Sequence, residues 1–244
     1  MQSRLKLKAV KMLAVVLLMA VAPPGVPEVN AEASTTAHVM RFNLVSHGMT
    51  VGHGSITRAP TLRDGKSCME LRLVIDSKVN LLLYKYSLKM DETWVSGPGG
   101  LIAYKLDSVE NGRHKTITGE LHNGVFNFEI TEAGQKRAWT TPRTAFDLAS
   151  NSQPVPALAD GEERKIRVLD PAACTITERV YRGTGRKMLA VGRQKIMCDT
   201  VTIKCPGTHI RRWFITDKFG SLILREDGRE KRGTYSRRAI SMGP

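Results

Sequence analysis

The stretch Cys68–Asp76 reads CMELRLVID, and it decides the fold class. Apolar side chains at Met69, Leu71, Leu73 and Ile75 alternate with mostly polar ones. Side chains of a strand point alternately to opposite faces, so this pattern predicts a strand with one buried face and one wet face. Strands of this kind are typical of antiparallel sheets.

The same alternation continues on both sides of this stretch. Val39–Val45, residues 81–89 (LLLYKYSLK) and Val125–Ile130 are the clearest examples before residue 131. Further strands are predicted at residues 165–169, 174–182, 187–191, 195–204, 209–216, 222–226 and 232–238. Asn-Gly and Asp-Gly pairs favour tight hairpin turns, which we expect at Asn111-Gly112, Asn123-Gly124 and Asp227-Gly228.

One segment breaks this pattern. Residues 142–162 contain Pro142, Pro154 and Pro156 but keep apolar side chains such as Phe146, so we expect a packed crossing segment with one or two short helices. The chain is therefore predicted to be all-β, a curved antiparallel sheet or half-open β-barrel with one or two short helices.

The first 31 residues have the order of a secretory signal peptide. Basic residues precede the apolar run Met12–Ala22, and Val29-Asn30-Ala31 offers a small-residue cleavage site. We expect residues 1–31 to be removed and residues 32–244 to form a single β domain in the periplasm. Its first half would be residues 32–141, its crossing segment 142–162 and its second half 163–244.

The chain carries a formal net charge of +14. Because we expect the protein to be exported, anionic lipid headgroups and acidic polysaccharides are the expected binding partners of this positive charge. Nucleic acid is not expected. Ten Lys or Arg residues lie between Lys204 and Arg238, against four acids. Guanidinium groups suit phosphate and carboxylate groups, although such charge also protects sheet edges. The residues expected to contact anionic groups are Arg211, Arg212, Arg225, Lys231 and Arg232.

Aromatic side chains are the second candidate set. On the concave face of a curved sheet they would line a ligand pocket, and Tyr and Trp combine apolar area with a polar tip. Core packing is the alternative interpretation. The ligand-binding candidates are Tyr84, Tyr86, Trp94, Tyr104, Trp213 and Phe214.

An oxidising compartment favours disulfides among the four cysteines. Cys198 and Cys205 lie seven residues apart on one predicted strand, roughly 23 Å at about 3.3 Å per residue, and on opposite faces. They cannot bond each other if that strand is straight. The disulfide candidates are therefore Cys174 with Cys198 or Cys205, while Cys68 stays free.

Motifs for catalysis and for metal binding are missing. The sequence has no GxSxG or HExxH motif and no CxxC pair, so we predict no catalytic residues, no metal and no cofactor. Glu92, Glu120 and Glu129 could project into a cavity, where a pair of carboxylates could act on carbohydrate. Glu92, close to Trp94, is the acid candidate, and its alternative role is that of a rim or turn carboxylate that caps a hairpin.

Several short motifs resemble those of a family of exported, periplasmic bacterial all-β proteins of uncharacterised function. These motifs are Tyr84-x-Tyr86, Glu92-x-Trp94, Gly100-Leu101, Asn111-Gly112, Gly48–Gly52 and Trp213-Phe214 followed by Asp217 and Gly220. The cysteines and the basic C-terminal part depart from that family's pattern. More distantly, the late hairpin is similar to those of LolA/LolB-type lipoprotein carriers, a resemblance that implies a curved sheet around an acyl-chain cavity.

These observations predict an exported, non-enzymatic binding protein of the cell envelope for an apolar or amphipathic, lipid-like ligand. Two alternatives stay open: a structural or protein-interaction module of the envelope, and an enzyme acting on envelope carbohydrate. The expected partners are a lipid-like ligand or an envelope protein, with peripheral membrane contact and no nucleic acid.

Overall fold

The computed structural model describes residues 37–81, 84–149, 158–217, 220–230 and 233–243. The chain divides into two compact units, residues 1–32 and 33–244, and every described residue belongs to the second unit. The predicted signal peptide, residues 1–31, lies outside the described residues.

The described part of the chain forms fifteen strands, all in one sheet, and one short 3-10 turn. The strands before the crossing segment are β1 (His38–Ser46), β2 (Met49–Arg63), β3 (Lys66–Leu81), β4 (Tyr84–Gly97), β5 (Gly100–Glu110), β6 (Arg113–His122), β7 (Val125–Glu132) and β8 (Gln135–Pro142). The later elements are η1 (Arg143–Ala145), β9 (Leu148–Ala149), β10 (Glu163–Asp170), β11 (Thr175–Val191), β12 (Gln194–Cys205), β13 (Thr208–Asp217), β14 (Gly220–Glu230) and β15 (Gly233–Gly243).

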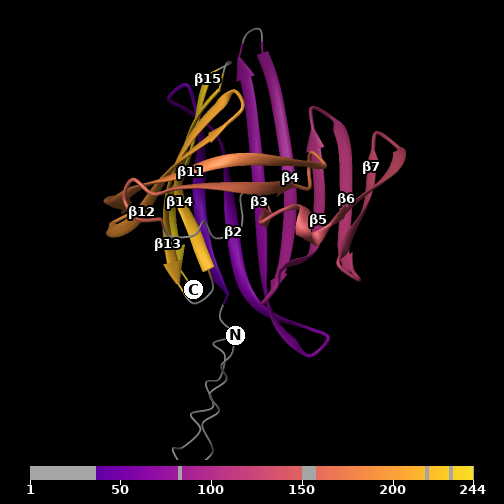
Figure 1. Cartoon of the computed structure of the whole chain (residues 1–244). Helices are drawn as coiled ribbons and strands as arrows, with labels where there is room; N and C mark the ends of the chain where they lie inside the picture. Colours follow the sequence, from indigo (N-terminus) through magenta and orange to yellow (C-terminus); the bar gives the residue numbers. More distant parts are fainter. Residues whose placement is uncertain (1–36, 82–83, 150–157, 218–219, 231–232, 244) are drawn as a thin grey trace, which may run out of the picture. The chain divides into compact units, whose positions relative to one another are not determined.

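The strand order shows how the sheet is assembled. It runs β8-β7-β6-β5-β4-β3-β2-β1-β15-β14-β13-β12-β11-β10-β9, so each half is a meander and the two halves join where β1 pairs with β15. All pairs are antiparallel except β9 with β10. The sheet is curled and stays open, with β8 and β9 as its two edges (Figure 1). The predicted all-β class with a curved antiparallel sheet is therefore confirmed.

The main core lies where the curled sheet packs against itself. Ile56, Leu73 and Trp94 of the first half belong to the same buried cluster as Val191 and Cys198, near the β11–β12 turn. Aromatic rings continue this cluster across β4 to β8, with ring centroids 5.2–6.3 Å apart from Trp94 to Trp139. A second cluster in the later half includes Tyr181, Ile203 and Phe214. Burial of such apolar surface is the dominant favourable contribution to folding.

The predicted turns have two different outcomes. Asn111-Gly112 and Asn123-Gly124 form hairpin turns, with positive φ at both residues of each pair. The prediction of a turn at Asp227-Gly228 is wrong, because both residues lie inside β14. Gly228 is needed there for another reason: a Cβ at this position would come within 2.1 Å of the Tyr235 ring.

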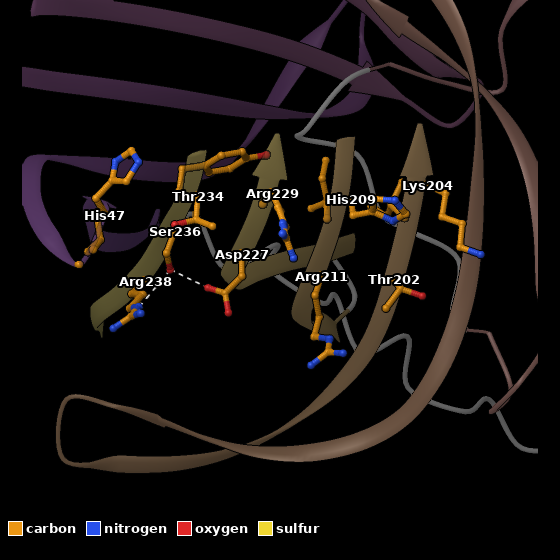
Figure 2. Close-up of a pocket in the computed structure, with 16 residues that line it drawn as sticks. His47, Thr202, Lys204, His209, Arg211, Asp227, Arg229, Thr234, Ser236 and Arg238 are labelled. Atoms are coloured by element: carbon orange, nitrogen blue, oxygen red, sulfur yellow. Dashed lines mark hydrogen bonds between the residues drawn. The ribbon is translucent and has the colours of Figure 1, made fainter. Parts of the chain in front are cut away.

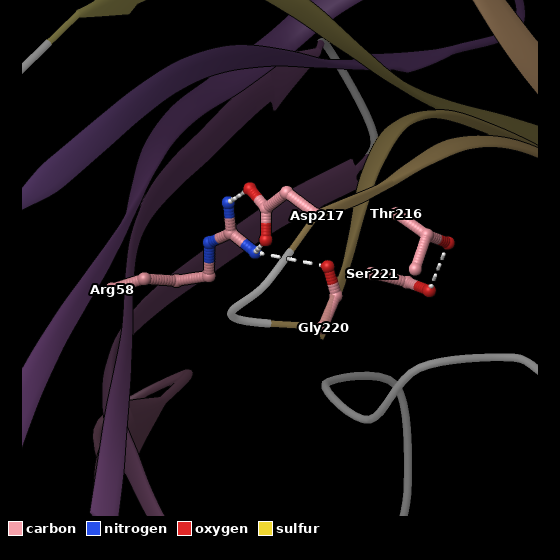
Figure 3. A network of polar contacts seen from close by, with 5 residues as sticks. All are labelled: Arg58, Thr216, Asp217, Gly220 and Ser221. Carbon is pink, nitrogen blue, oxygen red and sulfur yellow. Dashed lines mark hydrogen bonds and ion pairs between the residues drawn. The ribbon is translucent and has the colours of Figure 1, made fainter. Parts of the chain in front are cut away.

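A buried arginine ties β2 to the opposite half of the sheet. The Arg58 guanidinium donates to both carboxylate oxygens of Asp217, at 3.2 and 2.7 Å, and to the carbonyl oxygen of Gly220 at 3.3 Å (Figure 3). Beside it, the hydroxyls of Thr216 and Ser221 are 3.0 Å apart. Arg58 is 3% exposed, whereas the Asp217 side chain is 37% exposed, so these partly buried bonds help to hold the ends of β13 and β14 in place.

The crossing segment packs onto the core, as its apolar residues predict. It contributes the 3-10 turn Arg143–Ala145 and the two-residue strand β9, and Phe146 is 2% exposed against Phe126. Residues 150–157 lie outside the described residues. In the part of the chain that the structure covers, no helix has the length and apolar character needed to cross a membrane.

Candidate functional site

The candidate site is a groove over β12 to β15, which we call the basic groove (Figure 2). Its volume is about 560 Å³, within the usual range for ligand pockets. Two rows of directly opposed residues run across these four strands. The first row is Thr202, Arg211, Asp227 and Ser236, and the second is Lys204, His209, Arg229 and Thr234.

Register explains why these residues meet on one face. Members of a row are cross-strand partners, and the two rows are two residues apart along every strand, so all eight residues share a face. Neighbouring strands are about 4.8 Å apart. Arg238 and His47 also line the groove, and the backbone N–H of His47 donates to the Thr234 carbonyl at 3.4 Å.

Positive charge dominates the groove. Its lining contains four Lys or Arg side chains and a single carboxylate, Asp227. Arg225 donates to both oxygens of Asp227, at 3.0 and 2.6 Å, and the Ser236 hydroxyl adds a bond of 2.6 Å. Burial opposes ionisation, but these hydrogen bonds still lower the pKa of Asp227 below its usual value. The one acid is thus already occupied by Arg225, which leaves the lining cations available to an anion.

The groove offers little apolar side-chain surface. Val45, Ile203, Ile210 and Tyr235 are among its lining residues. Ile203 and Ile210 are buried, whereas Lys204, His209, Arg211, Arg229 and Arg238 are exposed. Ile203 and Ile210 alternate with the groove-facing residues of β12 and β13, so their side chains turn to the second core cluster. Val45, the cross-strand partner of Ser236, is the apolar lining residue that shares the groove face.

The opposite face of β13 to β15 buries charges. Arg212 Nε donates to the Glu226 carboxylate, and both side chains are largely enclosed. Burial favours the neutral form of Glu226, but Arg212 and then Arg237 outweigh it and lower its pKa. Burial lowers the pKa of Arg237, and its Nε and one terminal nitrogen have no hydrogen-bond partner. Arg237 also lies over the Phe42 ring, 5.5 Å from its centroid.

The structure separates the residues that were expected to contact anionic groups. Arg211 lines the groove, and Arg225 lies at its margin, bound to Asp227 and 4.7 Å from the centroid of the Trp213 ring. Arg212 is 2% exposed and faces the other side. Lys231 and Arg232 lie outside the described residues.

The predicted aromatic set is distributed over the packed interior. Trp94, Tyr104 and Trp213 belong to the main core cluster and Phe214 to the second one. Trp94 and Tyr104 contact each other, with ring centroids 5.9 Å apart. Their cross-strand pairing brings them together and keeps them away from the basic groove. Tyr86 is half-buried on β4, and the side chain of Tyr84 lies outside the described residues.

Glu92 lies in the interior and not at a rim. It is 7% exposed, between its cross-strand partners Leu73 and Leu106, and the Tyr104 hydroxyl donates to it at 2.6 Å. Burial raises the pKa of Glu92 to about 8 despite that hydrogen bond. At neutral pH it is therefore mainly a neutral acid held by Tyr104.

The disulfide prediction is corrected by the structure, in which all four cysteines are free thiols. Cys174, Cys198 and Cys205 each direct Sγ to a nearby backbone carbonyl, of Pro171, Ile196 and Thr208, at 3.5–3.6 Å. Cys198 belongs to the main core cluster, whereas Cys205 packs against the second one. The expected separation of these two thiols on opposite faces of the strand is confirmed. The bridge from Cys174 to either of them is not formed.

Sequence reasoning missed most of the groove. His47, Lys204, His209, Arg229 and Arg238 were not singled out, although all except His47 lie in the basic stretch from Lys204 to Arg238. Alternation along each strand was visible, but the pairing between strands was not. Among the described residues, no group of three or more His, Cys, Asp or Glu side chains could hold a metal ion.

The fold and groove define this protein as an open, curled all-β sheet with a cationic groove in its second half. Comparison with protein-family profiles, curated proteins and solved structures finds no match. The resemblance to exported bacterial all-β proteins therefore stays a prediction from short motifs.

Proposed function

We propose that this protein is an exported, non-enzymatic binding protein that holds the anionic part of an amphipathic envelope molecule in the basic groove. One observation carries the proposal: four Lys or Arg side chains and two histidines surround about 560 Å³ in which the single acid is already paired. The signal-like N-terminus supports a periplasmic location, where anionic amphiphiles are abundant.

The chemistry of the groove favours a phosphate-bearing headgroup. Arginine forks bind phosphate oxygens in pairs, and lysine adds a compact positive charge. Arg211, Arg229 and Lys204 occupy neighbouring positions on β13, β14 and β12, so one headgroup can contact more than one of them. The half-buried Val45, opposite Ser236 on the groove face, would contact the part of the ligand next to its headgroup.

The test is co-flotation of the purified full chain with lipid vesicles. Binding is measured to vesicles of phosphatidylcholine alone and of phosphatidylcholine mixed with phosphatidylglycerol. We expect binding to the anionic vesicles only. The Lys204→Gln/Arg229→Gln variant should bind roughly thirtyfold more weakly, because each of the two cations contributes about 1 kcal/mol near an anionic surface. Both side chains are exposed, so the fold should be kept.

A matched control separates the groove from net charge. The Arg113→Gln/Lys136→Gln variant removes the same charge from exposed positions on β6 and β8. If the groove is the site, this control binds nearly as well as the unchanged protein. Equal losses in both variants, or no binding to anionic vesicles, would overturn the proposal.

A further inference from the structure

A second cavity lies away from the basic groove and is lined by buried hydrogen-bond donors. We call it the donor pocket. Its volume is about 480 Å³, and it is bounded by β2, β3 and β4, the β4–β5 turn, the crossing segment and the start of β14. Nothing in the proposed groove function uses it.

Three side-chain N–H groups on this pocket's lining residues are buried without an acceptor. They are Arg58 Nε, Trp94 Nε1 and Arg143 Nε. Arg58 is 3% exposed and Trp94 is 2% exposed, so bulk solvent has little access to these two side chains. Buried polar groups in proteins are almost always paired, and an unpaired one is costly. Three such donors around one cavity indicate a missing acceptor.

The donors are held rigidly. Arg58, Leu71 and Trp94 are successive cross-strand partners, so they stand in one row on one face of the sheet. The terminal nitrogens of Arg58 are fixed by Asp217 and Gly220. This leaves its Nε as the donor that has no partner.

Arg143 is fixed in a similar way from the other side. Its terminal nitrogens donate to the carbonyls of Phe146 and Gly99 at 2.9 and 3.0 Å, and its guanidinium lies 4.7 Å from the centroid of the Phe146 ring. Gly100 leaves the space for this arginine, since a Cβ there would lie 2.5 Å from its terminal nitrogen. Preorganised donors of this kind bind an oxyanion with little loss of conformational entropy.

The charges around the pocket favour a single negative charge on the ligand. Arg58 pairs with Asp217, and Arg167 pairs with Asp147, both at 2.7 Å. Arg143 is then the third guanidinium beside two carboxylates, although its charge also reaches Asp147. One net positive charge matches a carboxylate better than a doubly charged phosphate. Met69, Leu71 and Leu148 add apolar walls.

We propose that the donor pocket binds a small carboxylic acid with an apolar body, its carboxylate accepting from Arg58, Trp94 and Arg143. The test uses the full chain and isothermal titration calorimetry with octanoate, octan-1-ol and inorganic phosphate. We expect octanoate to bind. Octan-1-ol, which has the same apolar body without the charge, and phosphate should bind at least tenfold more weakly.

Two variants probe the donors. Trp94→Phe keeps the ring but removes Nε1, and Arg143→Lys keeps the charge but removes the fork. Each should weaken octanoate binding by about tenfold, as expected for one hydrogen bond to a charged group. Trp139→Phe is the matched control, because this half-buried tryptophan lies on β8 outside the pocket, and it should bind octanoate unchanged. Far-ultraviolet circular dichroism confirms that each variant is folded.

Three results would overturn the proposal: no binding of octanoate, equal binding of octan-1-ol or phosphate, or full octanoate affinity in both donor variants. The proposal does not depend on the basic groove. The Lys204→Gln/Arg229→Gln variant should therefore bind octanoate normally even if vesicle binding is lost, so the two proposals can fail separately.

Discussion

The two faces of β13 to β15 treat the same kinds of residue in opposite ways. Arg211, Asp227 and Arg238 belong to the groove face, where their side chains meet water and an anion can reach the arginines. Their chain neighbours Arg212, Glu226 and Arg237 are turned to the interior and buried. One step along a strand thus changes an arginine from a potential ligand contact into a part of the core.

This contrast shows that the role of each cation depends on which face of the sheet its side chain points to, and not on the local charge density. An exposed cation keeps its hydration and contributes little to stability, so it is available for binding. A buried cation has lost its hydration and needs a counter-charge. Removing that counter-charge therefore lowers the free energy of unfolding strongly.

The largest expected effect is on the buried face. Glu226→Gln removes the carboxylate between Arg212 and Arg237 and should lower the free energy of unfolding by about 3 to 5 kcal/mol. Asp227→Asn, its neighbour on the groove face, should lower it by about 1 kcal/mol or less. Denaturant unfolding measures both values, and similar losses would abolish the distinction between the faces.

Glu92, a buried carboxyl on β4 of the first half, gives the stability of the protein a dependence on pH. Its pKa is about 8 in the folded protein and about 4.5 for an ordinary glutamate. Between these values the unfolded chain loses a proton that the folded protein keeps, so stability falls as pH rises from 4.5 to 8.

The Glu92→Gln side chain cannot titrate, so the free energy of unfolding of this variant should not fall as the pH rises. Relative to the unchanged protein, the variant should gain roughly 2 to 4 kcal/mol across this pH window. Thermal or denaturant unfolding at a series of pH values provides the measurement. A constant difference between the two proteins would show that Glu92 titrates normally.

Salt should weaken the electrostatic interactions of the groove face but have little effect on those of the buried face. Exposed charges are screened over about 10 Å at ~0.1 M ionic strength, whereas buried pairs are screened far less. We expect vesicle binding to fall several-fold as sodium chloride is raised, with unfolding free energy nearly constant. The reverse pattern would contradict the assignment of the groove as the binding face.

The smallest expected effect concerns the thiols. All four cysteines are free, so a reductant should change the unfolding free energy by less than about 0.5 kcal/mol. Loss of a disulfide would instead cost about 2 to 5 kcal/mol. Thiol counting under denaturing conditions is an independent check, and fewer than four reactive thiols would contradict the structure.

The fold class could be predicted from the sequence, because alternation in stretches such as Cys68–Asp76 requires no knowledge of the partner strand. The turn at Asn111-Gly112 could also be predicted from these two residues alone, because they tolerate the positive φ angles that the turn requires. Asp227-Gly228 did not, since its glycine makes room for a ring from β15, a residue seven positions further on.

The groove could not be predicted because it depends on register between strands. The alternation assigns Arg211 and Arg212 to opposite faces but does not say which face is wet. A register shift between Trp213 and Phe214 changes the pairing with β14, from Arg225 to Ile223 within one step on β13. Such shifts arise from tertiary packing and have no local sequence signature here.

The pairing of β1 with β15 has a consequence for how the chain reaches its fold. Val39 lies opposite Gly243, so the first and last described strands meet in the middle of the sheet and not at an edge (Figure 1). Local hairpins on either side can form early, but the central seam pairs strands that are far apart in the sequence and is expected to form late. Until then β1 is an unpaired edge. In a molecule that lacks residues 233–243, β1 and β14 stay unpaired edges, and such a molecule should be prone to self-association through them.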